Sequence, residues 1–497
     1  MFLKHAQYPT IFVGLVRFVC PSVYRWRMPH RLLPLLLAIP AMYACRPATP
    51  VAGVPTPRAE PPPLPAACGV PASATVSRAG EAVVDPVATF DTAWTIIRRS
   101  HWDTTYNGVD WVAVRDELRP QAVRARTRGE LQAVLSEMVG RLRQSHFSVI
   151  PQEVADGASG GSTAPRGGGA LGFETRLVEG RPMVTRVDTG GPAWTAGVRT
   201  GWVVETVRGC PMAARLARLP AGLEPRRVGL MAYQIVTGAL AGSEGDTMTV
   251  GFRDGRDRPR PRRLTHGAAP GSVAKVGNLP PLPAHLTWQR VRRDGRTLGI
   301  IRFNIWMPVL AAQFDAAMDS LRTADALVLD LRGNVGGIGG MSMGVAGHFL
   351  DSAYAIGTMT QRGSTLNFVA NPRRVDTRAR AVTPFAGPLA IVVDAMSVST
   401  TEIFAGGLQA VRRATVFGTQ TAGEALPSVP ERLPNGDILY HAVADFIGPS
   451  GKPVEGDGVM PDRVIPLTRR ALLDGHDAAL EAALFWAARQ SGRPLAP

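Results

Sequence analysis

Between residues 81 and 156 the apolar side chains recur at helical spacing. Phe90, Trp94 and Ile97 occupy positions i, i+4 and i+7 of a first stripe, and such spacing places side chains on one face of a helix. The pattern predicts a small helical subdomain over 81–156. A second stripe comprises Leu131, Val134, Leu135, Met138 and Leu142.

Short alternating apolar runs follow a Gly/Ser/Ala-rich stretch at 157–169. Glycine and serine clusters of this kind are typical of domain boundaries. Runs such as Met183–Val187 and Trp202–Val207 alternate with turn residues, which is the pattern of half-buried strands. We therefore expect a β-rich domain over 165–270.

From residue 285 to 497 strand-like and helical patterns alternate. Such alternation indicates an α/β layer structure with largely parallel strands. The expected buried strands are 299–303, 326–331, 389–393 and 414–418, with helices at about 309–322 and 400–411. A closing helix is expected to turn Leu480, Leu484, Phe485 and Trp486 toward the core.

The N-terminus has the layout of an export signal. Arginines precede an apolar run, 32–44, that ends at Ala44-Cys45 and is shorter than the ~20 residues of a membrane-spanning helix. We interpret 1–45 as a signal peptide whose true start is Met1 or Met28, and lipidation of Cys45 stays open. The Pro/Ala-rich stretch 46–80 reads as a semi-rigid linker.

Charge distribution and cysteine spacing argue against nucleic-acid binding and against a metal site. The formal net charge is +15, but the basic residues are dispersed, and their densest run, 253–263, is interrupted by Pro, Gly and Asp and reads as a solvated loop. Nucleic acid is therefore not expected as a partner. The four cysteines form no CxxC or Cys/His cluster, so no metal or other cofactor is predicted. Pairing of Cys68 with Cys210 stays open.

Three segments of 285–497 carry residues that a plain core does not need. Glycine-rich 330–337 (DLRGNVGG) follows a buried strand, where backbone N–H groups can approach a ligand oxygen. Segment 397–402 (SVSTTE) opens a helix, whose N-terminal N–H groups favour negative charge. Segment 455–462 (EGDGVMPD) carries a loop carboxylate. Alone, each also fits a turn, a helix cap or a solvated side chain.

Together and in this order, the three segments resemble the motifs of the C-terminal processing protease and tricorn core protease superfamily. The resemblance extends over roughly 83–470 and includes a PDZ-like segment around Leu171-Gly172-Phe173. It implies a crotonase/ClpP-like α/β protease core over 285–497, with an N-terminal helical subdomain and an inserted PDZ-like domain. It departs from the PDZ pattern at Trp202, where aspartate is usual.

The resemblance implies that Ser399 is the nucleophile. The oxyanion hole would then come from backbone N–H groups of Gly336 or Gly337 and of Thr400. Members with a Ser/Lys dyad place lysine 25 residues after the serine, but Glu424 stands there, and no lysine occurs from 276 to 451. A Ser/Lys dyad is therefore not expected.

The tricorn-like branch instead uses histidine, and Ser145-His146 and Glu455 match its pattern. Imidazole titrates near pH 6.5, so His146 could act as a base at neutral pH. Ser145 and Glu455 would orient it.

We rank a serine peptidase acting on unstructured polypeptides first, with Leu171, Gly172 and Phe173 binding peptide C-termini. Its expected location is periplasmic or otherwise extracytoplasmic, and its only membrane contact would be a lipid on Cys45. A non-catalytic ligand- or peptide-binding protein and an acyl-CoA enzyme on the same fold remain alternatives.

Overall fold

The computed structural model describes residue 68 and residues 80–155, 168–275, 277–279 and 281–491. The predicted signal peptide, Cys45 and nearly all of the predicted linker lie outside these residues. Within the described part of the chain, no helix is long and apolar enough to span a membrane.

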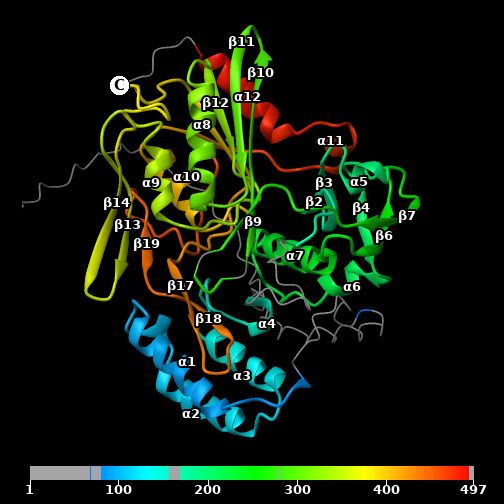
Figure 1. Cartoon of the computed structure of the whole chain (residues 1–497), viewed down its shortest axis with the longest axis vertical. Coiled ribbons are helices and arrows are strands. Elements are labelled where there is room, and N and C mark those ends of the chain that lie inside the picture. The colour runs from blue at the N-terminus through cyan, green and yellow to red at the C-terminus, as the bar shows by residue number, and fades with distance from the viewer. Residues whose placement is uncertain (1–67, 69–79, 156–167, 276, 280, 492–497) are drawn as a thin grey trace, which may run out of the picture. The chain divides into compact units, whose positions relative to one another are not determined.

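A six-stranded sheet organises the C-terminal part, in the order β10-β11-β12-β15-β16-β20. Its strands β10, β11 and β12 are labelled in Figure 1. Only β10 runs antiparallel to its neighbour, and the other pairs are parallel. The predicted mixed α/β class is therefore confirmed. The strands are β10 (Leu286–Arg293), β11 (Arg296–Phe303), β12 (Ala326–Asp330), β15 (Leu389–Val393), β16 (Thr415–Gly418) and β20 (Arg463–Val464).

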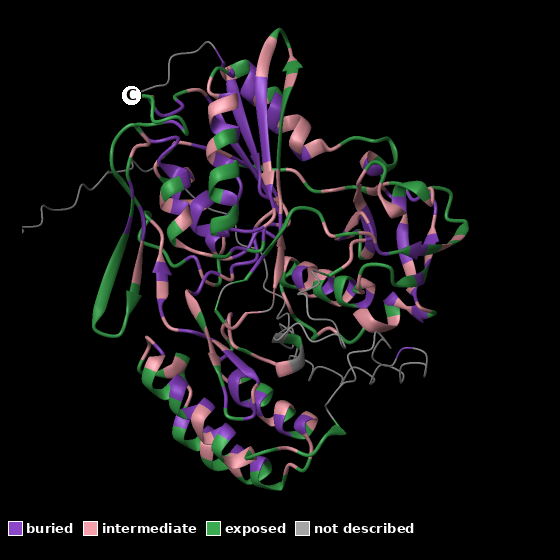
Figure 2. Ribbon diagram, in the orientation of Figure 1, coloured by how far each residue is buried: buried purple, intermediate pink, exposed green. Residues whose placement is uncertain are grey.

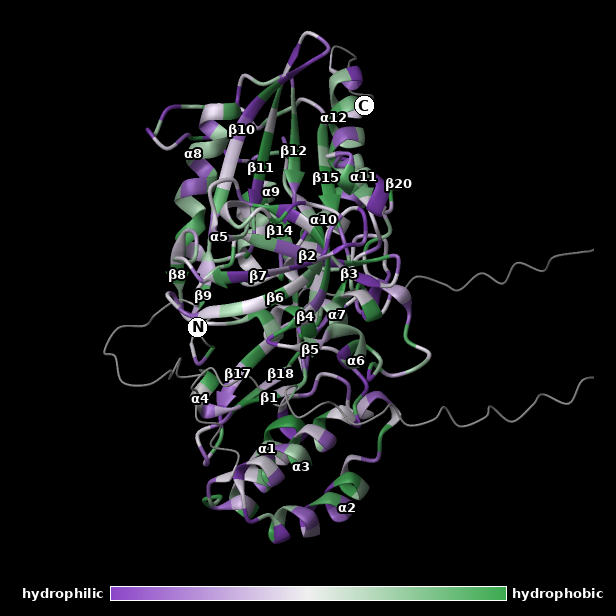
Figure 3. Ribbon diagram, turned by 90° about the vertical axis from the view of Figure 1, so that its right-hand side faces the viewer, coloured by the Kyte–Doolittle hydropathy of each residue, from purple (hydrophilic) through white to green (hydrophobic). Residues whose placement is uncertain are grey.

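Helices cover both faces of this sheet. Because side chains alternate across a strand, Leu327 and Leu329 of β12 join one apolar cluster, and Ala326 and Val328 join another. Both faces are therefore buried (Figure 2), and β12 and β15 are hydrophobic along their length (Figure 3). The first face packs on α8 (Ala311–Leu321), α9 (Gly340–Ala346) and α10 (Thr400–Ala410), with η4 (Pro308–Leu310) before α8, and the second on α12 (Ala478–Gln490).

A second six-stranded sheet occupies the region predicted to be β-rich, in the order β2-β3-β4-β6-β7 with β5 beside β4. A disulfide joins Cys210 of β5 to Cys68, which settles the pairing that the sequence left open. The strands are β2 (Phe173–Val178), β3 (Arg181–Val187), β4 (Val203–Val207), β5 (Cys210–Pro211), β6 (Thr247–Arg253) and β7 (Pro259–Thr265). The helices are α5 (Pro192–Thr195), α6 (Met212–Leu216) and α7 (Pro225–Leu240).

The predicted helical region forms α1 (Pro86–Ser100), α2 (Trp111–Arg124) and α3 (Arg128–Gly140), followed by β1 (Ser148–Ile150) and α4 (Gln152–Ala155), with η3 (Tyr106–Gly108) between α1 and α2. The Asp110 carboxylate caps α2 by accepting from two backbone N–H groups, and Thr127 and Glu130 form a capping box on α3.

The helical core is completed by a hairpin from far along the chain. The hairpin of β17 (Ser428–Arg432) and β18 (Ile438–Ala442) places Leu433 and Leu439 among the buried side chains of α1–α3. Strand β1 pairs with β18, with Ser148 opposite Tyr440. The hairpin thereby fixes the segment just after His146 against the C-terminal part. The remaining strands are β8 (Ser272–Ala274), β9 (Leu282–Ala284), β13 (Tyr354–Gln361), β14 (Ser364–Ala370) and β19 (Asp445–Ile447), and the remaining helix is α11 (Arg469–Leu473).

Two local predictions need correction. The arginine-rich run 253–263 is a loop only at 254–258, because Arg253 ends β6 and 259–263 belong to β7; Arg260 and Arg258 pair with Asp254. Phe485 of α12 is 45% exposed, because the inner side of this helix consists mainly of alanines that pack closely on the sheet.

Candidate active site

Ser399 lies at a sharp turn between a buried strand and a helix. Strand β15 ends at Val393, and α10 begins at Thr400. Ser399 has φ 58° and ψ −120°, a region that a residue with a side chain adopts at a cost of roughly 1–3 kcal/mol. A strained strand–serine–helix turn presents a hydroxyl at the helix N-terminus, where unpaired N–H groups gather.

Glu402 holds this turn in place from inside the protein. Its buried carboxylate accepts four hydrogen bonds: from the N–H groups of Ser399 (3.0 Å), Glu424 (3.1 Å) and Gly423 (2.7 Å), and from the Thr421 hydroxyl (2.6 Å). Burial raises the pKa of Glu402 to about 7, against the opposite effect of these donors. The Ser399 N–H also donates to the Glu424 carbonyl at 2.9 Å. One carboxylate thus ties the serine turn to the 421–424 loop.

The glycine-rich loop comes close enough to Ser399 to form an oxyanion hole. A Cβ at Gly336 would lie 2.6 Å from the Ser399 Cβ, so only glycine fits there. The Gly336 N–H donates to Asn334 Oδ1 at 3.1 Å and is therefore occupied. Among the described residues, the N–H groups of Gly337 and Thr400 have no acceptor. Of the three predicted positions, these two offer free donors beside the serine.

His146 reaches the same place from the helical region. It lies two residues before β1, whose pairing with β18 fixes its position, and its own φ is 60°. His146 and Ser399 line one cavity, together with Gly336, Gly337 and Thr400. Burial lowers the pKa of His146 to about 4, so the imidazole is neutral at physiological pH.

Ser145 and Glu455 hold the imidazole in a hydrogen-bonded chain. The Ser145 hydroxyl lies 2.7 Å from His146 Nδ1 and donates to Glu455 Oε2 at 2.8 Å. A hydroxyl has one proton to give, so Nδ1 carries its own proton and donates to Ser145, which leaves Nε2 unprotonated. The backbone N–H groups of Ser145 (3.0 Å) and Ala425 (2.9 Å) also donate to Glu455. Burial raises the pKa of Glu455, which these bonds oppose.

Glu424, at the position of the missing lysine, faces an arginine of another element. Its carboxylate lies 4.0 Å from Arg227 of α7, and burial raises its pKa. Lys275 and Lys452, the two lysines in the described part of the chain, do not line the cavity of Ser399. Among the described residues, the cavity of Ser399 is thus lined by an imidazole and by no lysine.

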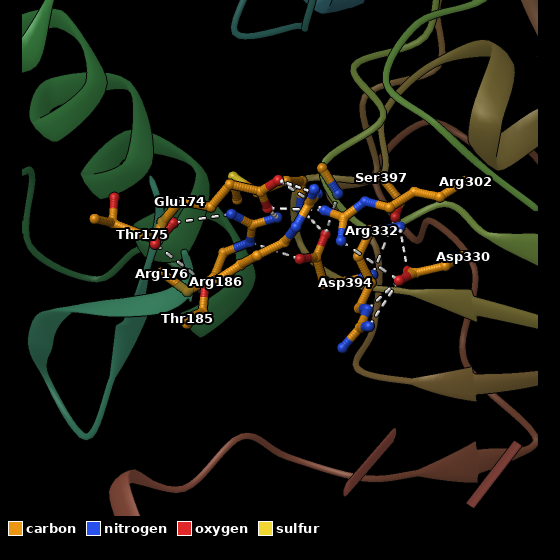
Figure 4. Close-up of polar contacts among 12 residues, drawn as sticks. Glu174, Thr175, Arg176, Thr185, Arg186, Arg302, Asp330, Arg332, Asp394 and Ser397 are labelled. Carbon is orange, nitrogen blue, oxygen red and sulfur yellow. Dashed lines mark hydrogen bonds and ion pairs between the residues drawn. The ribbon is translucent and has the colours of Figure 1, made fainter. Parts of the chain in front are cut away.

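A network of buried charges lies behind the two loops (Figure 4). The Asp394 carboxylate accepts from the N–H groups of Gly333 (3.1 Å) and Met396 (2.9 Å), and from Arg176 Nε of β2 at 2.6 Å. Ser397 donates to the Leu331 carbonyl at 2.9 Å. These contacts hold the glycine-rich loop and the serine turn against each other and connect them to the second sheet. Sequence reasoning gave no role to Asp394 or Glu402, although Glu402 stands three positions after Ser399.

The predicted peptide-binding residues lie elsewhere. Leu171, Gly172 and Phe173 do not line the cavity of Ser399; they lead into β2, which is an edge strand of the second sheet. Gly172 has φ 74° and lies against Pro192. No group of three or more His, Cys, Asp or Glu side chains among the described residues could hold a metal ion.

The family model for peptidase family S41 matches residues 297–465, which include the glycine-rich loop, Ser399 and Glu455. Residues 297–465 are thus a peptidase domain of family S41. Residues 87–140 of this S41 peptidase match the tricorn protease C1 domain, and this segment contains all of α1 except Pro86, together with α2 and α3, which precede His146. The chain is thus a serine-type peptidase.

Curated relatives of this S41 peptidase are similar over most of its length. Carboxyl-terminal-processing peptidase 2 of Arabidopsis thaliana is 27% identical over 75% of this chain and 68% of its own. The putative tricorn protease homolog 2 of Streptomyces coelicolor is 26% identical over 76% of this chain and 30% of its own.

Solved structures share the fold of this S41 peptidase. Mature CPAF covers 83% of this chain and 99% of its own at 14% identity, with a TM-score of 0.56. The photosystem II D1 C-terminal processing protease covers 80% of this chain and 99% of its own at 22% identity, with a TM-score of 0.51.

Proposed function

We propose that this S41 peptidase hydrolyses extended or unstructured polypeptides through an acyl-enzyme on Ser399, with His146 as general base. Support comes from one placement: Ser399 and an imidazole with a free Nε2 line the same cavity, beside two unpaired N–H donors. A nucleophile, a base and a group that orients the base are the parts that acyl transfer requires.

In the proposed reaction, Ser399 Oγ attacks the substrate carbonyl carbon while its proton passes to His146 Nε2. The carbonyl oxygen becomes an oxyanion that accepts from the N–H groups of Gly337 and Thr400. His146 then protonates the departing amine as the C–N bond breaks, which leaves an ester on Ser399. Water, deprotonated by His146, hydrolyses the ester and restores the serine. Ser145 and Glu455 keep Nδ1 protonated throughout.

The second sheet, within 165–270, is proposed to be a PDZ-like domain that selects substrate C-termini. Strand β2 is an edge strand, so an extended peptide could pair with it while the backbone of Leu171, Gly172 and Phe173 receives the terminal carboxylate. The Ser399→Ala full chain should then bind an unstructured peptide with a free C-terminus more tightly than its amidated form. Equal affinity for both forms would show that this region does not recognise the terminal carboxylate and serves only as a spacer.

Export to an oxidising, extracytoplasmic compartment is proposed from the N-terminal pattern, and the Cys68–Cys210 disulfide supports it. Residues 81–156 are proposed to act as a subdomain that supplies Ser145 and His146, and 285–497 as the peptidase core. Lipidation of Cys45 would be the membrane anchor. Mass spectrometry of the mature protein from a membrane fraction tests this, because an unmodified N-terminus would exclude the anchor.

The experiment that tests the proposed function compares the full chain with its Ser399→Ala and His146→Ala variants. Each is incubated with reduced, unfolded model proteins, and new termini are mapped by mass spectrometry. We expect cleavage by the parent and losses of at least ~1000-fold in both variants. Ser450→Ala, which removes an exposed loop hydroxyl, is the matched control and should cleave normally. Absence of cleavage by a folded parent would favour a binding protein on the same fold.

A further inference from the structure

The cavity that contains Ser399 has a volume of about 400 Å³. The two free oxyanion donors, Gly337 and Thr400, lie on its wall. When these donors hold the carbonyl of the cleaved bond, the substrate residue that supplies this carbonyl lies against the cavity. The side chain of that residue begins only two bonds from the carbonyl carbon, so it must lie in or near the cavity.

The wall near the serine is apolar and comes from three elements. Ile403 lies one helical turn after Ser399 on α10, and Ile338 follows the glycine pair of the oxyanion loop. Met359 of β13 and Phe368 of β14 enter from a hairpin. Phe368 is only 5% exposed and packs edge-on against Phe446, with ring centroids 5.1 Å apart. Its ring is therefore held firmly in the wall.

No charged partner for a substrate side chain lines this cavity. Among the described residues on its wall there is no Asp, Glu, Lys or Arg, and His146 and Tyr440 are the titratable ones. A charged substrate side chain would lose its hydration here without a compensating ion pair, and burial of an unpaired charge is strongly unfavourable. A bulky apolar side chain would instead gain from leaving water.

We propose that Met359, Phe368, Ile338 and Ile403 form the specificity pocket for the side chain on the acyl side of the cleaved bond. The pocket selects bulky, uncharged aliphatic or aromatic residues. This inference rests on the proposed function, since a substrate pocket exists only if Ser399 is the nucleophile.

Gly339 gives a way to reshape this pocket by one methyl group. Its backbone is helical (φ −52°), which alanine also adopts, and the added Cβ would lie 3.3 and 3.4 Å from two ring carbons of Phe368, so it presses on this ring and narrows the pocket. Gly344 of the same helix, α9, is exposed and has no heavy atom within 4 Å of its added Cβ. Gly344→Ala is therefore a matched control that changes helix propensity without touching the cavity.

The experiment measures kcat/KM of the full chain for an unstructured peptide series that differs only at the residue before the cleaved bond. We expect Leu, Met and Phe to exceed Asp, Glu, Lys and Arg by about 100-fold or more. Gly339→Ala should lower the Phe/Ala ratio by about tenfold, since one methyl group in an apolar pocket changes selectivity 10–200-fold. Gly344→Ala should leave the ratio unchanged.

A charge reversal provides a second test that does not depend on Gly339. Met359→Glu should raise the Arg/Leu ratio at least tenfold, because a substrate guanidinium would pair with the new carboxylate. Thr360→Glu adds the same charge at the next, exposed position of β13, where side chains point to the opposite face, and should change nothing. Parent cleavage with no apolar preference, or equal effects of Met359→Glu and Thr360→Glu, would overturn the pocket while leaving the proposed function intact. A parent that cleaves no member of the series or of the unfolded proteins would contradict the function itself.

Discussion

At the scale of single residues, the arrangement of proton donors around His146 determines which nitrogen can act as a base. The Ser145 hydroxyl stands between Nδ1 and the Glu455 carboxylate, at 2.7 and 2.8 Å. The Ser145 hydroxyl fixes the orientation of the imidazole and keeps the negative charge of Glu455 out of direct contact with the ring. The imidazole therefore gains little electrostatic stabilisation when it is protonated, and burial dominates its pKa.

The pH dependence of catalysis follows from that burial. Because burial lowers the pKa of His146 to about 4, the neutral base persists as pH falls below 6.5 and is lost only as pH approaches 4. We expect the acid limb of kcat/KM to lie well below pH 6.5. Rate measurements from pH 3.5 to 8 check this, with circular dichroism to show that the chain stays folded. An acid limb at or above pH 6.5 would contradict it.

Replacing Glu402 by glutamine should destabilise the fold. The carboxylate accepts four donors, and a glutamine amide would turn its own N–H₂ toward some of them, at a cost of about 1–3 kcal/mol. Urea denaturation measures this loss, with Glu244→Gln on the surface as a control that stays near zero. Burial raises the pKa of Glu402 in the folded chain from 4.5 to about 7. The contribution of Glu402 to the free energy of unfolding therefore falls as the pH rises from 4.5 to about 7. A loss below 0.5 kcal/mol would show that the four bonds contribute little.

Sequence motifs singled out Ser399, Ser145, His146 and Glu455. The structure brings Ser399 and His146 to one cavity, Ser145 into contact with the imidazole, and Glu455 into contact with Ser145. Glu402 was part of a motif but had no predicted role. Its four donors come from the serine turn and from the loop at 421–424, and the closeness of two such segments is a property of the tertiary structure.

At the scale of elements, α7 connects the second sheet to the loop that carries Glu455. Arg226 donates to the carbonyl of Gly456 and, at 3.2 Å, to that of Asp457. On its other side the same loop is held by a bond from the Gly456 N–H to the Gly423 carbonyl at 2.9 Å. The position of Glu455 therefore depends on an element outside the S41 core.

Arg226→Ala should lower kcat/KM about tenfold, because the loop that carries Glu455 loses two bonds and orients the imidazole less well. Arg218→Ala removes an exposed arginine before the same helix and should have no effect. Single-turnover rates on one cleavable peptide separate this loss from weaker binding. Equal rates for both variants would show that the 421–425 loop alone positions Glu455.

The regular strands and helices of the core were predictable, because buried strands such as β12 and β15 are continuous apolar runs. The pairing of β1 with β18 was not, since the two strands are 290 residues apart at Ser148 and Ile438 and no local pattern encodes a distant partner. Strand β7 was missed because its half-buried face carries Arg260 and Arg262 beside Leu264, so that apolar and polar residues do not alternate along the strand.

At the scale of the whole molecule, the disulfide between Cys68 and Cys210 closes a loop with a sequence separation of 142 residues. A cross-link over so long a loop restricts the unfolded chain strongly and stabilises a fold by about 2–4 kcal/mol. Because Cys68 precedes α1 and Cys210 lies in β5, the link joins the first residue that the structure describes to the second sheet.

Cys68→Ser, Cys210→Ser and the double variant should each lose this same ~2–4 kcal/mol in denaturant titrations under oxidising conditions. With reductant present, the parent should fall to the stability of the variants. Additive losses in the double variant would contradict a disulfide, since two unpaired cysteines contribute independently.

The β17–β18 hairpin has a consequence for the order in which the enzyme is made. His146 and the three helices leave the ribosome early, but Leu433 and Leu439, which complete their core, emerge near the end of synthesis. The base therefore cannot be fixed beside Ser399 until almost the entire chain is available. In the proposed mechanism a nascent chain therefore holds Ser399 and His146 apart, so we expect proteolytic activity only when synthesis of the chain is nearly complete.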